Sequence, residues 1–270
     1  MLTPFKFRDK SYVLKKVLRI LRTDPVITTH QLENRLDFNP PEREIKPTAA
    51  DWLGLLDSEG FVCIEHLVKT SVGARVKTPE QFVCASKRVA ELTDWNLRQL
   101  AGLAALRYGL GIRSDNWQLR ALERTNQSNV PIPDAMIHLS RATNPQVFQS
   151  DSYAFRGLRK VSKAKPSEVI AIEWDSGSAT RTEMIGKIHS YAQVANYQIW
   201  VAPTTVRAKT ITELLKDYLP IDASLVVAVD WRSADLLWLM LPHRGSSLEQ
   251  FVSRVSNVDA PWSIALKSLH

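Results

Sequence analysis

Cysteine is scarce in this chain, because only Cys63 and Cys84 occur among 270 residues. Two thiols are too few for a disulfide framework or a four-thiolate zinc site, so we expect a reduced, cytoplasmic protein. Long apolar runs are also missing, and no stretch approaches the roughly 20 apolar residues that a membrane-spanning helix needs. The N-terminal segment MLTPFKFRDK lacks the apolar stretch and cleavage site of a signal peptide. We therefore expect no membrane partner.

Motifs of several enzyme classes are absent as well. The sequence contains no Gly-rich phosphate loop, no HExxH and no Ser-His-Asp order. Nucleotide hydrolysis and serine chemistry therefore have no support in the sequence.

Acidic residues are outnumbered by basic ones, with 28 Asp and Glu against 35 Lys and Arg and a net charge of +7. A basic balance favours encounters with a polyanion, although a generic basic protein would share it. The hydrophobic content of 44% supplies packed cores, and the length suits one large domain or two ordinary ones. Basic residues cluster around the first helix and in a later loop, at Lys6, Arg8, Lys10, Lys15, Lys16, Arg19, Arg22, Lys160, Lys163 and Lys165.

Residues 1–86 carry the pattern of three helices followed by a two-stranded ribbon. Apolar spacing predicts a helix over 11–21, and Asp24-Pro25 ends it. After an extended pair at 26–27, a second helix is expected from Thr28 to about Leu36. A third helix over 48–60 precedes strands at 61–64 and 81–84. This order is that of a winged helix-turn-helix, in which the third helix enters the DNA major groove.

The segment LLDSEGFV, residues 55–62, resembles the end of the recognition helix and the first wing strand of bacterial winged-helix regulators. A small helical domain that contacts protein fits the same pattern. The third helix is acidic and has no Lys or Arg between Thr48 and Gly60. We therefore expect DNA phosphate contacts from Lys15, Lys16, Arg19, Arg43, Lys46, Lys69, Arg75 and Lys77.

The rest of the chain predicts a connecting helix and an α/β domain. Helical spacing over 87–108 indicates one long helix within a connecting segment, 87–112. In the domain over 113–270, helices are expected at 114–126, 179–195 and 209–219. Strands are expected at 134–139, 147–158, 168–175, 197–202 and 225–231. This alternation indicates a mixed sheet covered by helices, and the tail from residue 236 is expected to cap the sheet.

Acidic residues stand at the ends of two predicted strands. Asp134 opens the strand over 134–139, and Glu173 and Asp175 close the strand over 168–175. Carboxylates that neighbouring strands bring to one sheet edge can hold a hard cation such as Mg²⁺, which metal-assisted phosphodiester cleavage requires. Glu173 is the strongest candidate, because a carboxylate in an apolar strand is unfavourable unless it is paired or bound to metal. Turn chemistry is the alternative explanation for Asp134 and Asp175.

The order of elements over 114–231 resembles the core of PD-(D/E)XK nucleases: a helix, a strand bearing Asp, a strand ending in Glu-x-Lys, a helix and a strand. With the upstream winged helix, the chain resembles the bacterial replication-relaxation family of plasmids and other mobile elements. The shared motifs are Pro133-Asp134-Ala135, the acid pair Glu173 and Asp175, and a Lys and a Tyr on the following helix.

This resemblance implies a DNA-binding, Mg²⁺- or Mn²⁺-dependent endonuclease. The implied catalytic residues are Asp134, Glu173 and Lys187. The implied metal ligands are Asp134, Glu173, Asp175 and, from the preceding helix, Glu123, for which a solvated helical position is the alternative. Tyr191 is the implied DNA contact of the nuclease-like domain.

One position departs from the nuclease pattern. Asp175 stands where these nucleases have the lysine that orients the attacking water. Lys187 is the nearest substitute, and its spacing from Tyr191 places both on one helix face. In several branches of these nucleases the lysine has moved to this helix, where a Gln-xxx-Tyr pair contacts DNA.

Two other functions remain open. The first is a catalytically inactive DNA-binding factor for plasmid or mobile-element replication or transfer. The second is a transcriptional regulator whose α/β half senses a ligand or oligomerises. The expected partner is DNA, and assembly into a homodimer is a further open alternative.

Overall fold

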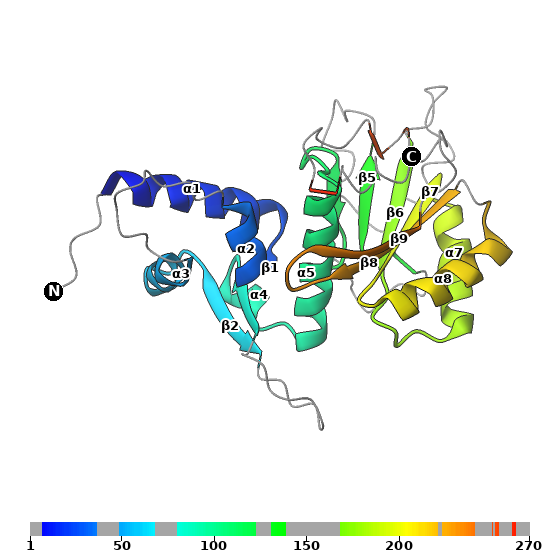
Figure 1. Ribbon diagram of the computed structural model, residues 1–270, viewed down its shortest axis with the longest axis horizontal. Helices are drawn as coiled ribbons and strands as arrows, with labels where there is room; N and C mark the ends of the chain where they lie inside the picture. The colour runs from blue at the N-terminus through cyan, green and yellow to red at the C-terminus, as the bar shows by residue number, and fades with distance from the viewer. Residues whose placement is uncertain are drawn as a thin grey trace. The chain divides into compact units, whose positions relative to one another are not determined.

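The computed structural model describes residues 7–36, 49–67, 80–122, 131–138, 168–220, 223–240, 250, 252–253 and 261–262 (Figure 1). The chain divides into two compact units. Unit 1 comprises Met1–Leu106 with Val229–Asp235, and unit 2 comprises Arg107–Ala228 with Leu236–His270. Within the described residues, no helix combines the length and the apolar character needed to cross a membrane.

Unit 1 combines helices with a small antiparallel sheet. Its elements are α1 (Phe7–Thr23), β1 (Val26–Thr28), α2 (Thr29–Arg35), α3 (Ala49–Ser58), β2 (Cys63–Leu67), β3 (Glu80–Cys84), α4 (Lys87–Ala90) and most of α5 (Asp94–Gly109). The three strands are ordered β1-β3-β2, and both pairings are antiparallel. The first three predicted helices and the strand pair of the ribbon are therefore present.

Local capping and apolar burial explain why these segments fold. The Thr28 hydroxyl accepts a hydrogen bond from the backbone N–H of Gln31 at 3.0 Å, which caps the start of α2. Apolar side chains of the helices and of β3 bury one another, and full burial of each stabilises the unit by about 1.5–3 kcal/mol. This core contains Val17, Leu21, Ile27, Leu32, Leu36, Leu53, Leu56, Val62, Val83 and Ala104.

A buried polar network adds to this core. Arg35 donates to Asp24 at 2.6 Å and to the carbonyl oxygen of Ala104 at 2.7 Å, and the side chains of both Arg35 and Asp24 are almost completely buried. Gln31 donates to the carbonyl oxygens of Ala101 and Trp231. These hydrogen bonds connect α2 and the residue after α1 to α5 and to the 231–234 turn.

Two predictions of helices are wrong. The segment 87–108 is two helices, α4 and α5, because residues 91–93 leave the helical conformation and the Thr93 hydroxyl accepts a hydrogen bond from the Asn96 N–H at 3.4 Å. In the described part of the predicted helix over 114–126, residues 117–119 form a strand, β4 (Trp117–Leu119). Asn116 fixes this strand, since its side chain donates to the carbonyl oxygen of His138 at 2.7 Å.

Unit 2 is built on a six-stranded mixed sheet, so the predicted α/β class is confirmed. The strand order is β4-β5-β6-β7-β8-β9. The elements after β4 are β5 (Ala135–His138), β6 (Val169–Trp174), α7 (Arg181–Ala192), β7 (Tyr197–Ala202), α8 (Thr205–Tyr218), β8 (Ser224–Asp230) and β9 (Asp235–Met240). The turn between β8 and β9 belongs to unit 1.

The start of the tail, which we expected to cap the sheet, instead supplies the edge strand β9. The predicted strand over 147–158 lies outside the described residues.

The directions in which the strands pair determine which strand ends lie next to each other. β5 runs antiparallel to both β4 and β6, while β6, β7 and β8 run parallel to one another. Helices α7 and α8 connect the parallel strands and pack on one face of the sheet, with Met184, Ile188, Ile211 and Leu215 against Ala171, Trp200 and Val226. The beginning of β5 and the end of β6 consequently meet at one edge of this face.

Candidate functional site

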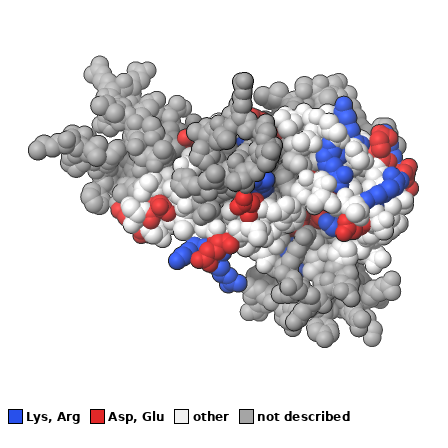
Figure 2. Space-filling model, turned by 90° about the horizontal axis from the view of Figure 1, so that it is seen from below, with Lys and Arg blue, Asp and Glu red and all other residues white. Residues whose placement is uncertain are grey.

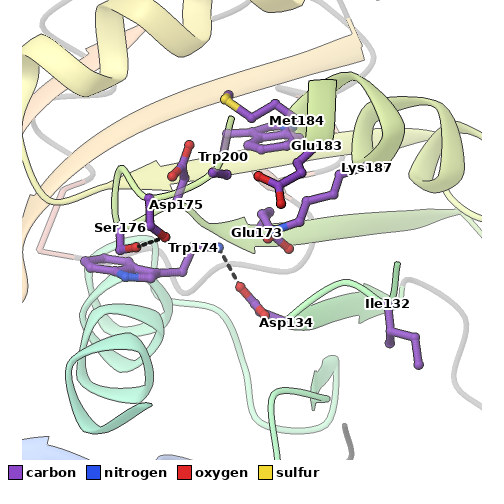
Figure 3. Close-up of polar contacts among 12 residues, drawn as sticks. Ile132, Asp134, Glu173, Trp174, Asp175, Ser176, Glu183, Met184, Lys187 and Trp200 are labelled. Atoms are coloured by element: carbon purple, nitrogen blue, oxygen red, sulfur yellow. Dashed lines mark hydrogen bonds and ion pairs between the residues drawn. The ribbon is translucent and has the colours of Figure 1, made fainter. Parts of the chain in front are cut away.

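Asp134 and Glu173 lie opposite each other at this edge. The register pairs Ala135 with Ile172, and the Asp134 N–H donates to the Ile172 carbonyl oxygen at 2.9 Å, so Asp134 and Glu173 form the next pair. Asp134 is 0% exposed and Glu173 is 1% exposed. The Asp134 carboxylate also accepts a hydrogen bond from the Trp174 N–H at 2.8 Å (Figure 3). Two buried carboxyl groups thus share one end of the β5–β6 pair.

Two side chains of α7 contact Glu173. The Lys187 amine forms an ion pair with Oε1, and the Tyr191 hydroxyl donates to Oε2 at 2.6 Å. In Figure 3 the Lys187 side chain reaches from α7 to the Glu173 carboxyl group. A capping box between Thr180 and Glu183 fixes the start of the helix. The i,i+4 spacing of Lys187 and Tyr191 then directs both toward the same carboxyl group.

Tyr191 is buried in this arrangement, with 1% of its surface exposed. Its hydroxyl also lies 3.3 Å from the carbonyl oxygen of Ile132, to which it can donate. In this structure the side chain that we predicted as a DNA contact therefore supports Glu173.

The electrostatics of Glu173 follow from its position. Burial, with the charge of Asp134 acting in the same direction, raises the pKa of Glu173 to about 8. The charge of Lys187 and the hydrogen bonds from Lys187 and Tyr191 oppose this rise. The protonated carboxyl and the carboxylate paired with Lys187 are therefore close in free energy near neutral pH. A further cation beside the two acids would favour the ionised form.

Asp175 pairs with Arg207 and not with the groups around Glu173. Its Oδ2 accepts hydrogen bonds from Arg207 Nε at 3.1 Å and Nη2 at 2.7 Å, while Oδ1 accepts from the Gly177 N–H at 2.8 Å. Arg207 also donates to the carbonyl oxygen of Ala179 at 3.0 Å. In Figure 3 the Asp175 carboxyl group points away from Asp134. Asp175 thus joins the first turn of α8 to the loop that follows β6.

The structure brings together four of the predicted residues of unit 2: Asp134, Glu173, Lys187 and Tyr191. Six other predicted residues lie outside the described residues, namely Glu123, Arg43, Lys46, Lys69, Arg75 and Lys77. On α1, the side chains of Lys15 and Arg19 are exposed and that of Lys16 is half-buried. Figure 2 shows one face of the molecule, on which described basic and acidic residues are interspersed.

Two arginines near the acids were missed by sequence reasoning. Arg207 lies far from Asp175 in the sequence and belongs to no local motif. Arg120 follows β4, and its N–H donates to the Asp134 carbonyl oxygen at 2.8 Å. Burial, and after it the positive charge of Arg120, lowers the pKa of His138. Because we predicted a helix over 114–126, we did not expect Arg120 near the acids. A prediction that 117–119 pairs with 135–137 would have placed Arg120 opposite Asp134.

Among the described residues, Asp134 and Glu173 are the members of the predicted metal-ligand set that lie together, and Glu123 lies outside the described residues. Within the described part of the chain, no group of three or more His, Cys, Asp or Glu side chains could hold a metal ion. Mg²⁺ is usually held by one or two carboxylates, with water and substrate phosphate completing its coordination. The pair of carboxyl groups therefore fits a Mg²⁺ site that substrate and water complete.

Comparisons with protein-family models, with curated proteins and with solved structures find no match to this chain. Function is therefore inferred from the geometry of the site itself.

Proposed function

We propose that unit 2 is a divalent-cation-dependent, nuclease-like domain of the PD-(D/E)XK type that cleaves phosphodiester bonds in DNA. The observation that carries the proposal is the ion pair between Lys187 and Glu173 beside Asp134. Two carboxyl groups and one lysine amine are the side chains that such a site requires. Here the amine comes from α7, while the usual lysine position on the strand holds Asp175.

The order of elements around these residues supports the proposal. Asp134 directly precedes β5, and β5 pairs antiparallel with β6. Helix α7 follows β6, and β7 then pairs parallel with β6. A strand with Asp, a strand with Glu, a helix and a parallel strand is the same order as in the PD-(D/E)XK core. The position that we predicted as a helix before the Asp strand is taken by β4, which pairs with β5.

Each side chain has a distinct role in the proposed reaction. Asp134 and Glu173 would hold Mg²⁺ or Mn²⁺, which would neutralise charge on the scissile phosphate. The Lys187 side chain is 26% exposed, so its amine can hydrogen-bond both Glu173 and an incoming phosphate oxygen or water. The Tyr191 hydroxyl holds Glu173 in place, and the Arg207–Asp175 pair fixes the loop beyond β6.

We further propose that unit 1 is a winged-helix domain that binds the DNA backbone. The element order α1-β1-α2-α3-β2-β3 and the strand order β1-β3-β2 support this assignment. The exposed cations Lys15, Arg19 and Arg22 lie on α1, whereas α3 contains no Lys or Arg. Binding through α1 would contact phosphates without reading bases. Membership of the replication-relaxation family and assembly into a homodimer remain proposals.

A catalytically inactive DNA-binding factor is the second candidate. The observation that favours it is the occupation of both Glu173 oxygens by Lys187 and Tyr191, together with the commitment of Asp175 to Arg207. These contacts involve protein groups alone, so they are compatible with a domain that has lost cleavage. In the described residues, we find no feature that favours a ligand-sensing regulator.

The test is cleavage of supercoiled plasmid in Mg²⁺ or Mn²⁺ by the full-length protein and its Glu173→Gln variant. The matched control is Glu213→Gln, since Glu213 is an exposed carboxylate on α8. The proposal predicts metal-dependent nicking by the wild type and the control, and its loss in Glu173→Gln. Absence of cleavage by the wild type, with salt-sensitive DNA binding retained, would establish the inactive factor instead.

A further inference from the structure

The two cysteines of the chain lie opposite each other in unit 1. Cys63 is the first residue of β2 and Cys84 is the last residue of β3, and the antiparallel register pairs them directly. Both are thiols in this structure. The sequence contains no other cysteine, so any disulfide within the chain has to join these two.

The pairing meets the geometric requirement for a disulfide. Directly opposed residues of antiparallel strands project to the same face, with Cα atoms about 4.5–5.5 Å apart. A disulfide accepts Cα separations of about 4.4–6.8 Å. The register continues without interruption from the Cys63–Cys84 pair to Leu67 and Glu80, so no shift of the strands is needed.

The two thiols differ in access. Cys84 is 0% exposed and is also paired, through β3, with the buried residue Val26 of β1. Cys63 is only half-buried. A small reagent therefore reacts with Cys63 first. Cys84 reacts only with the modified sulfur of Cys63.

We propose that Cys63 and Cys84 form a redox-modification site that a small-molecule disulfide such as oxidised glutathione converts to a reversible cross-strand disulfide. The Cys63 thiolate attacks one sulfur of glutathione disulfide and expels one glutathione thiolate. The Cys84 thiolate then attacks the Cys63 sulfur of the mixed disulfide and expels the second. The two cysteines lose two electrons, the reagent gains them, and both protons end on the two glutathione thiols.

The modification has a physical consequence for unit 1. The new bond closes the segment 64–83, which includes the basic residues Lys69, Arg75 and Lys77. Closing a loop of this length restricts the unfolded chain and stabilises the folded unit. We expect the melting temperature of unit 1 to rise by roughly 10 °C on oxidation and to return on reduction.

The experiment exposes the full-length protein to oxidised glutathione, blocks remaining thiols with an alkylating reagent in denaturant, and measures the intact mass and the linked peptides. The expected product is monomeric, takes up no alkylating reagent, has lost two hydrogens, and contains one Cys63–Cys84 link. Cys84→Ser should instead stop at a mixed disulfide on Cys63. Cys63→Ser should remain unmodified, because its remaining thiol is buried.

Three results would overturn the proposal. The first is a mixed disulfide on Cys63 that persists in the wild type as it does in Cys84→Ser. The second is a disulfide between two chains, and the third is folded wild-type protein in which both thiols are still alkylated. None of these outcomes depends on cleavage, so the proposal stands or falls independently of the nuclease-like function.

Discussion

Lys187 of α7 forms an ion pair with Glu173 of β6, beside the buried carboxyl group of Asp134. A lysine amine is therefore present next to the two acids even though position 175 holds an aspartate. Tyr191, one turn further along the helix, donates to the other oxygen of the same carboxyl group. The proposed site thus depends on two strands and one helix that fold together within unit 2.

Substitution of Lys187 by alanine should lower the rate of metal-dependent DNA cleavage by about 100-fold or more, because positioned proton-transfer and charge-stabilising groups contribute effects of this size. Lys209→Ala is the matched control, since Lys209 is an exposed lysine of the neighbouring helix α8. Single-turnover cleavage rates of the two variants provide the comparison. Equal rates for Lys187→Ala and the control would remove Lys187 from the mechanism.

Replacement of Glu173 by glutamine should change how stability depends on pH. The pKa of Glu173 is raised from 4.5 to about 8, so the folded protein binds a proton that the unfolded chain has lost between these values. The stabilisation from this proton is complete below pH 4.5 and is lost as the pH rises through 8. Glu173→Gln, which cannot ionise, should escape that loss.

The difference is measurable by denaturant unfolding at several pH values in the absence of divalent cations. Well above pH 8 we expect the stability of Glu173→Gln relative to wild type to be higher than at pH 4.5 by on the order of 5 kcal/mol, because the pKa shift from 4.5 to about 8 corresponds to about 1.4 kcal/mol for each unit. A difference between the two proteins that is independent of pH would show that Glu173 has an ordinary pKa.

The ion pair between Asp175 and Arg207 should be structural. Removing one partner of a buried pair costs about 3–5 kcal/mol, and the 21% exposure of Arg207 reduces this figure through solvent screening. We expect Asp175→Ala to destabilise unit 2 by about 2 kcal/mol in urea unfolding. Asp217→Asn is the control, because its pair with Arg181 is highly exposed and should contribute less than about 1 kcal/mol. Similar losses in the two variants would argue against a structural role for Asp175.

The basic residues of α1 should govern the salt dependence of DNA binding. The triple substitution of Lys15, Arg19 and Arg22 by glutamine should weaken binding to unrelated DNA sequences to the same extent. It should also reduce the slope of log affinity against log salt concentration by roughly one for each lost phosphate contact. Lys209→Gln with Lys216→Gln provides a control on α8. An unchanged slope in the triple variant would show that α1 does not contact DNA.

Sequence patterns predicted much of the fold, because most elements carry local signals. The apolar spacing of α1, the Thr28 cap of α2 and the mostly apolar strands β6, β7 and β8 can each be recognised without knowledge of the rest of the chain. The strand β4 has no such signal, since its three residues and their apolar neighbours fit a helix equally well. Its conformation is determined by pairing with β5, which lies beyond residue 130.

The candidate site was predictable to a similar degree. Asp134 and Glu173 stand next to apolar strands, and the spacing of Lys187 from Tyr191 places them on one helix face, so their meeting could be anticipated. The pairing of Asp175 with Arg207 could not, because these residues are distant in the sequence and meet only after α8 has packed on the sheet. The opposition of Cys63 and Cys84 likewise depends on the register of β2 and β3.

The central claim is that Asp134 and Glu173, without Asp175, hold the divalent cation. The most direct measurement is a titration of Mn²⁺ into the metal-free wild type and into Asp134→Asn, Asp175→Asn and Glu213→Gln, with free Mn²⁺ followed by electron paramagnetic resonance. We predict that the wild type, Asp175→Asn and Glu213→Gln bind Mn²⁺ with similar affinity and that Asp134→Asn does not bind it. Binding by Asp134→Asn with the affinity of the wild type, or no binding by the wild type, would contradict the account.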